Sequence, residues 1–144
     1  MAQMTNEMME VLNNMAAPYL ATASKDGVPN VVPCGSTRAL SPDTITITAL
    51  HLNKTLVNLE ENPKVAMVFH TDLGTKEERR EAQAWQIRGR ASLVKSGDIF
   101  ERAKENAVKR FGEQVSNKVK AAVLIKVEEI YNVVAGPDAG RRVA

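Results

Sequence analysis

The chain has 144 residues, of which 44% are apolar and 25% are charged, as in a soluble globular protein with one core. Its net charge of +2 is small, and its basic residues are mixed with acids, which disfavours a nucleic-acid partner. No apolar run is long enough to span a membrane, and a single cysteine excludes an internal disulfide. We therefore expect one cytoplasmic domain over residues 1–144.

The N-terminal part predicts a helix followed by two strands. Residues 5–16 begin with a threonine that can cap a helix, and their apolar positions share one helical face. Residues 18–24 predict a short strand that ends at a Lys-Asp-Gly turn. A second strand is predicted over residues 28–40, with a bend at Pro33 and Gly35.

Residues 43–64 predict a strand that runs directly into a short helix. Threonine alternates with isoleucine and alanine in TITITA, and Asn53 is in place to cap the helix that follows. A helix start favours an anion, Lys54 adds a positive charge there, and Thr55 adds a hydroxyl donor. Asn58 lies on the same helix face as Lys54. We expect a phosphate site here, and a capped surface helix with a solvated lysine is the alternative.

The remaining pattern adds strands, a helix and a charged connection. Strands are predicted over residues 64–70, 84–94 and 120–134. Residues 72–81 are charged and predict an exposed hairpin loop, while Asp98 and Glu101 have the spacing of a helix capping box. The sum is about six mostly antiparallel strands and three helices. This pattern predicts a mainly β fold, a six-stranded antiparallel Greek-key barrel with flanking helices.

Several reactive residue types have ordinary structural explanations. Cys34 could be a redox thiol, but a lone strand cysteine is more often a small buried apolar residue. His51 and His70 are 19 positions apart, and no second cysteine completes a zinc ligand set, so we predict no metal site. Arg88 and Arg90 share the strand face opposite Trp85, where solvent or a partner subunit would contact them.

Three segments together carry a family resemblance. They are YLATASKDGVPNVVP, ITALHLNKTLVNLEENPKVAMVF, and AWQIRGRA followed by a helix, and their order spans residues 15–134. This arrangement resembles the FMN-binding split barrel of the pyridoxamine 5′-phosphate oxidase-like flavoproteins. The resemblance implies FMN as the cofactor and a homodimer with two FMN sites at its interface.

The resemblance also assigns roles to individual residues. Lys54 and Thr55 would hold the FMN phosphate, with Asn58 as a supporting neighbour. The end of the preceding strand would follow the edge of the isoalloxazine ring through three residues: Thr48, Ala49 and Leu50. Two residues of the second strand, Cys34 and Ser36, would approach the ring or the ribityl chain. The partner subunit would line the pocket with Trp85, Arg88 and the C-terminal tail.

The function implied is an FMN-dependent oxidoreductase or an electron-transfer flavoprotein, in which the flavin supplies the redox chemistry. Residues 136–144 lack the long basic and aromatic extension of the true oxidase, so we do not expect oxidation of pyridoxamine phosphate. The alternatives are a non-enzymatic flavin-binding module, the same fold with a deazaflavin or heme, and a dimer without a cofactor.

Overall fold

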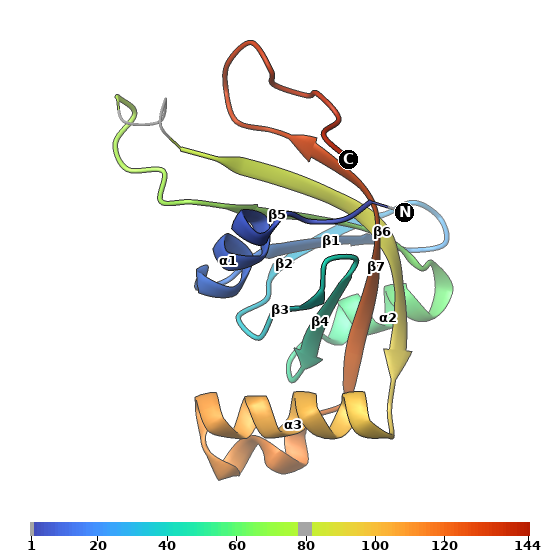
Figure 1. Cartoon of the computed structure of the whole chain (residues 1–144). Coiled ribbons are helices and arrows are strands. Elements are labelled where there is room, and N and C mark those ends of the chain that lie inside the picture. The colour runs from blue at the N-terminus through green and yellow to red at the C-terminus, as the bar shows by residue number, and fades with distance from the viewer. Residues whose placement is uncertain (1, 78–81) are drawn as a thin grey trace.

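One antiparallel sheet organises the computed structural model, which describes residues 2–77 and 82–144 (Figure 1). Its strands are β1 (Tyr19–Ala23), β2 (Pro29–Pro33), β3 (Arg38–Ser41), β4 (Thr44–Ala49), β5 (Lys64–His70), β6 (Ala84–Val94) and β7 (Ala121–Asn132). They lie in the order β2-β1-β5-β6-β7-β4-β3. The mainly β architecture is confirmed, but the prediction of a six-stranded barrel is wrong, because the described residues form seven strands in one unclosed sheet.

The extra strand arises where one long strand was predicted over residues 28–40. The chain instead forms β2 and β3, which lie at opposite edges of the sheet. β2 pairs with β1 and β3 pairs with β4, and residues 34–37 connect them. The Thr37 hydroxyl donates to the Cys34 carbonyl at 2.7 Å and so fixes the turn inside this connection. Because four residues join the two edges, the sheet must curl until those edges approach each other.

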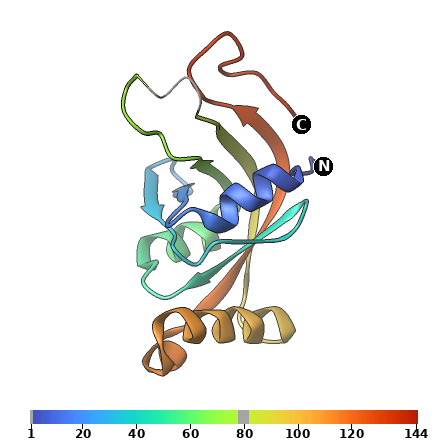
Figure 2. The ribbon, with the colours of Figure 1, turned by 60° about the vertical axis from the view of Figure 1, so that its left-hand side comes forward.

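Three helices flank the curled sheet: α1 (Asn6–Asn14), α2 (Asn53–Glu61) and α3 (Asp98–Phe111), the last followed by a 3-10 helix, η2 (Glu113–Lys118). Figures 1 and 2 place α3 below the ends of β4 and β7, with the C-terminal tail at the opposite end of the molecule. No helix in the described part of the chain is long and apolar enough to cross a membrane.

The helix caps agree with the sequence prediction at one helix and differ at two. Thr5 caps α1 as predicted, since its hydroxyl accepts the Met8 N–H at 3.2 Å. The prediction of Asn53 as a cap is wrong: α2 is preceded by Leu52, without a side-chain cap, and Asn53 is its first residue. The predicted capping box at Asp98 is also wrong, because α3 follows Gly97 and likewise lacks a side-chain cap.

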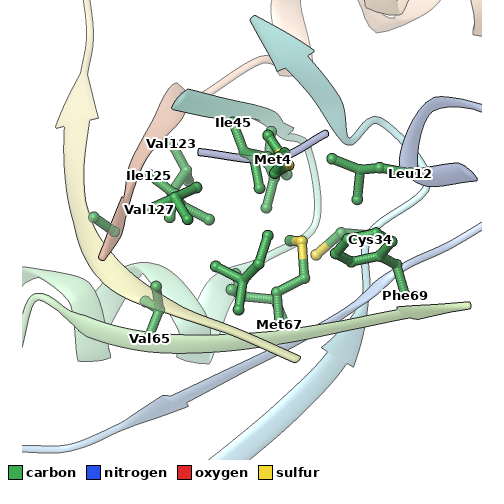
Figure 3. Close-up of a cluster of buried hydrophobic side chains, with 14 of the residues drawn as sticks. Met4, Leu12, Cys34, Ile45, Val65, Met67, Phe69, Val123, Ile125 and Val127 are labelled. Carbon is green, nitrogen blue, oxygen red and sulfur yellow. The ribbon is translucent and has the colours of Figure 1, made fainter. Parts of the chain in front are cut away.

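The core fills the inside of the curl (Figure 3). Its fully buried side chains come from α1 and from the inward faces of the strands, and they include Leu12, Leu20, Ile45, Ile47, Met67, Phe69, Ile87, Val123, Ile125, Val127 and Ile130. Trp85 also lies in the core, with its ring centroid 5.5 Å from that of Phe69. The alternation predicted for residues 84–94 is confirmed, because Trp85, Ile87 and Ala91 are buried while Arg88 and Arg90 are exposed.

The C-terminal tail and the described part of the loop between β5 and β6 lie at the end of the molecule opposite α3. Residues 72–77 of the predicted hairpin loop are mostly exposed, and residues 78–81 lie outside the described part of the chain. The C-terminal tail folds back along β7, where Arg142 forms a β-bridge with Tyr131 and Val143 donates its N–H to the Ile130 carbonyl at 2.8 Å. The tail therefore packs against its own strand.

A close backbone approach explains the glycine in the middle of β6. The register of β6 against β7 shifts between Arg88 and Gly89, which is the mark of a β-bulge. A Cβ atom at position 89 would lie 2.2 Å from the Lys126 carbonyl oxygen, far inside van der Waals contact. No side chain can fit there unless the two strands move apart.

Gly89→Ala should therefore destabilise the fold by about 2 kcal/mol or more, because the added methyl group meets fixed backbone. Urea unfolding followed by tryptophan fluorescence measures this change. Gly35→Ala is the matched control, since its added Cβ would meet its nearest neighbour, the Ala16 carbonyl oxygen, at an ordinary 3.5 Å. Equal stability of the two variants would contradict the close approach.

The turn between β3 and β4 is organised around the carboxylate of Asp43. The hydroxyls of Ser41 and Thr44 each donate to Asp43 Oδ1 at 2.8 Å, and Lys126 Nζ donates to the Thr44 hydroxyl at 2.8 Å. The hydrogen bonds from Ser41 and Thr44 favour the charged carboxylate and lower the pKa of Asp43 below its ordinary value.

This lowered pKa makes the stability of the protein depend on acidity. The folded-state pKa is the lower one, so the carboxylate adds stability above the unfolded-state pKa of about 4. That contribution is lost as the pH falls through the folded-state pKa. Asp43→Asn should lower the free energy of unfolding at about pH 7, and this difference should shrink as the pH is lowered to about 3. A constant difference at both pH values, measured by urea unfolding, would contradict this role.

Candidate functional site

The start of α2 presents backbone donors and two lysines. The first helical bond runs from Leu56 N–H to the Leu52 carbonyl at 2.9 Å, so the N–H groups before it have no partner within the helix. Lys54 is exposed beside them. The Asn53 side-chain oxygen accepts a hydrogen bond from Lys120 Nζ, which brings a second cation to the same helix start. This end of α2 can therefore bind an anion.

Lys120 is a candidate site residue that the sequence pattern did not indicate. It lies just before β7, and its N–H donates to the Ala49 carbonyl at 2.9 Å at the end of β4. Only the long-range pairing of β4 with β7, which aligns Ala49 with Ala121, brings it to the start of α2. No local spacing in the sequence could have predicted that approach.

A cavity of about 480 Å³, here called the α2 cavity, lies beside this helix start. α2 contributes Asn53, Lys54, Val57 and Asn58 to its lining, and the β1–β2 hairpin contributes Ser24, Val28, Pro29 and Asn30. Its volume is in the range of small-molecule sites. Both sides of the cavity mix polar and apolar residues, and Lys54 is the one charged residue among the described residues that line it, which suits a ligand with a charged end.

Beneath this cavity a polar network fastens α2 to β1 and β2. Asn30 Nδ2 donates to the Thr55 hydroxyl at 3.1 Å, and Asn58 Nδ2 donates to the Thr22 hydroxyl at 3.0 Å. Thr55 is fully buried and Asn58 is 8% exposed. The side chains of Thr55 and Asn58 thus hold the helix in position, while Lys54 faces outward. Of the three predicted phosphate contacts, Lys54 is the one whose side chain is exposed.

A second, smaller cavity of about 170 Å³, here called the β4 cavity, lies at the end of β4. Its lining includes four residues that the sequence predicted as cofactor contacts: Cys34, Ser36, Thr48 and Leu50. His51 and Phe111, which were not assigned to the cofactor, also line it. Ser36 Oγ donates to the Thr48 carbonyl at 2.9 Å and accepts the Thr48 N–H at 3.1 Å. One serine side chain therefore occupies both backbone groups of Thr48 on this side.

The other predicted residues at this end are buried or bonded to α3. Thr48 Oγ1 donates to the Ala103 carbonyl at 3.1 Å, and Ala49 is fully buried. Cys34 lies in the core beside Met67 and Phe69 (Figure 3). Burial raises the pKa of the Cys34 thiol to about 12, so the thiol stays protonated at neutral pH and is a poor nucleophile.

Trp85 and Arg88 lie apart from both cavities. Trp85 is only 8% exposed within its own chain. Arg88 is on the outer face of the sheet, with its guanidinium carbon 4.8 Å from the centre of the Tyr131 ring and Nη1 4.0 Å from Glu129 Oε2. The described residues hold no group of three or more His, Cys, Asp or Glu arranged to bind a metal ion.

Comparisons with known proteins identify the family. A family model described as pyridoxamine 5′-phosphate oxidase matches residues 4–134. The chain belongs to this family. The chain is also similar to an uncharacterized protein of Methanocaldococcus jannaschii. The two are 38% identical over 99% of this chain and 89% of the relative's length. Family membership accounts for the fold but leaves the ligand open.

Solved structures show how widely this pyridoxamine 5′-phosphate oxidase fold is shared. HupZ of Group A Streptococcus is 29% identical, with a TM-score of 0.75 over 95% of this chain and 99% of that chain. An FMN-binding protein from Syntrophomonas wolfei is 19% identical, with a TM-score of 0.72 over 90% of this chain and 88% of that one. A heme storage protein, HutZ of Vibrio cholerae, is 18% identical, with a TM-score of 0.66 over 90% and 94%. An F420 reductase is 17% identical, with a TM-score of 0.63 over 84% and 93%.

The polar network under the α2 cavity leads to a stability prediction. Thr55→Val keeps the side-chain shape but removes the hydroxyl that accepts from Asn30, so it should cost about 1–2 kcal/mol of unfolding free energy. Thr46→Val is the matched control, because the Thr46 hydroxyl makes a longer, exposed bond of 3.4 Å to the Arg38 carbonyl. Thermal and urea unfolding of both variants measure the difference. A larger loss in the Thr46 variant would contradict the structural role of Thr55.

Proposed function

We propose that this pyridoxamine 5′-phosphate oxidase family member is an FMN-binding flavoprotein that acts as a cytoplasmic oxidoreductase or electron carrier. The observation that carries the proposal is the α2 start, where backbone N–H groups and Lys54 lie beside a cavity of about 480 Å³ and Lys120 bonds the Asn53 side chain. When bound, FMN supplies hydride and electron transfer, and the protein binds and orients it.

The α2 start fits the phosphate end of FMN. A phosphate carries close to two negative charges and takes several donors, which the helix start and the two lysines offer together. Thr55 contributes its backbone N–H there, since its hydroxyl is buried in the network with Asn30. The apolar residues Val28 and Val57, both largely exposed, give the same cavity a surface that water would leave on binding.

The β4 cavity is the proposed place for the edge of the flavin ring, and its small size supports a dimeric site. A volume of about 170 Å³ lies below the usual range of ligand pockets, so one subunit alone encloses too little space. We propose a homodimer in which the partner subunit completes the pocket. Within one chain, Ser36 and the backbone of Thr48 and Leu50 would orient the ring edge.

The first experiment is the visible absorption spectrum of the purified protein, followed by release and mass identification of any chromophore. Released FMN supports the proposal, whereas a deazaflavin or heme would keep the fold and replace the cofactor. A colourless protein that fails to bind added FMN would overturn it. Turnover with reduced nicotinamide and an electron acceptor then separates an oxidoreductase from a protein that only stores the flavin.

Lys54→Ala should weaken FMN binding about tenfold, because one charge-assisted contact to the phosphate is lost. The side chain is exposed, so the unfolding free energy should change by less than about 0.5 kcal/mol. Fluorescence quenching of added FMN measures the affinity. Lys118→Ala is the control, since Lys118 is an exposed lysine in η2. Unchanged FMN affinity in the Lys54 variant would remove the phosphate assignment.

A further inference from the structure

α3 lies outside the hydrophobic core, as a separate layer below the ends of β4 and β7 (Figures 1 and 2). Among the described residues, none from α3 belongs to the core cluster or to the partly buried apolar residues packed against it. The two buried side chains of α3 are Ala103 and Ala107, and both are small. Because a helix that fully buries only methyl groups gains little free energy from packing, α3 needs other contacts to hold it.

Polar contacts hold α3 at its middle and at its C-terminal end. The Thr48 hydroxyl donates to the Ala103 carbonyl at 3.1 Å. The Arg110 guanidinium donates to the Gly35 carbonyl and, at 3.4 Å, to the Ala16 carbonyl. Arg110 therefore connects three separate segments, which are α3, the β2–β3 connection and the residues that follow α1.

A glycine at each end of α3 provides a place for the helix to turn as a unit. Gly97 precedes α3 with a φ of +90°, and Gly112 follows it with a φ of +98°, a region that other residues rarely adopt. Below the C-terminal end, a cavity of about 320 Å³ lies between α3 and the β2–β3 connection. This end of α3 is therefore not packed along its whole face, and movement there requires few side chains to separate.

α3 also covers the β4 cavity. Phe111, its last residue, lines that cavity together with Ser36 and His51. Gly35, whose carbonyl accepts from Arg110, lines the same cavity. The β4 cavity measures about 170 Å³, which is too small for a ring-sized ligand. Movement of α3 away from the sheet would withdraw Phe111 and widen this cavity.

We propose that α3 is a flap over the β4 cavity, held closed by Arg110 and hinged at Gly97 and Gly112. Opening breaks the bonds that Arg110 makes and carries Phe111 out of the cavity. Because those bonds are exposed and the core stays intact, opening costs much less free energy than unfolding the chain. The motion itself needs no cofactor, but its use to admit the edge of the flavin ring rests on the proposed function.

Thiol labelling of Ala103→Cys tests the opening in the full chain without a cofactor. The introduced thiol would lie on the buried side of α3, and peptide mass separates it from Cys34. Its reaction with iodoacetamide should be at least about tenfold faster than global unfolding allows, and less dependent on urea. The urea unfolding curve of the same variant gives that limit. A labelling rate equal to the limit would mean that α3 opens only when the whole chain unfolds, which would overturn the proposal.

Arg110→Gln tests the latch in the Ala103→Cys background. It should raise the labelling rate at position 103 about threefold or more, because the bonds to Gly35 and Ala16 are lost. Lys109→Gln is the matched control, since it removes the same charge from the same last turn of α3, and it should leave the rate unchanged. Equal acceleration in both variants would indicate an effect of charge alone and would reject Arg110 as the latch. Urea unfolding checks that each variant is folded.

Stopped-flow mixing with FMN separates the flap from the flavin proposal. Arg110→Gln alone should bind FMN at least about twofold faster than the wild type, because more molecules have an open β4 cavity, and Lys109→Gln should match the wild type. Faster labelling without faster FMN association would overturn the role of α3 as a flap over this cavity. A protein that binds no FMN would reject the proposed function, and thiol labelling would still decide whether α3 opens.

Discussion

The rest of the structure depends on one short connection, residues 34–37, which joins the two edge strands of the sheet. A flat sheet of seven strands would separate its edges by six strand spacings, about 29 Å. The five Cα-to-Cα steps from Pro33 to Arg38 span at most about 18 Å. The sheet must therefore curl, and its curl creates the enclosed side on which the core residues pack. The connection is also where the sheet fails to close.

The sheet does not close between its edge strands β2 and β3, and this gap, here called the seam, holds candidate site residues such as Ser36. Extending the β3–β4 register from the pair Arg38 and Thr46 by two residues would place Ser36 opposite Thr48. Ser36 uses its side-chain oxygen instead of its backbone to bond Thr48. A serine hydroxyl can both donate and accept, so it satisfies an edge that has no strand beside it. The β4 cavity lies at this seam, where Ser36 and Phe111 line it.

Local patterns were enough to predict most elements, and long-range contacts explain the rest. Alternation predicted β4 and β6, apolar strand-like runs predicted β5 and β7, and the Thr5 cap of α1 is confirmed. The strand predicted over residues 28–40 failed because period-2 alternation does not reveal that a chain changes its pairing partner. Capping preferences likewise ignore tertiary contacts, and the Asn53 side chain bonds Lys120, 67 residues away. The candidate site divides in the same way. Lys54 could be predicted from its neighbours in the sequence, whereas Lys120 could not, because a long-range contact brings it to the start of α2.

The two ends of the proposed flavin site differ in how much protein bonding a ligand must replace. At the α2 start, N–H groups outside the helical ladder can bond a phosphate without breaking an existing helix bond. At the β4 end, Ser36 already bonds both backbone groups of Thr48, so a ring edge there exchanges one set of bonds for another, with a net gain of about 1 kcal/mol or less per bond. Affinity should therefore come mainly from the phosphate end and from apolar burial. A phosphate end cannot distinguish FMN from a deazaflavin that also carries phosphate, so discrimination between these cofactors must come from the residues around Ser36 and Thr48.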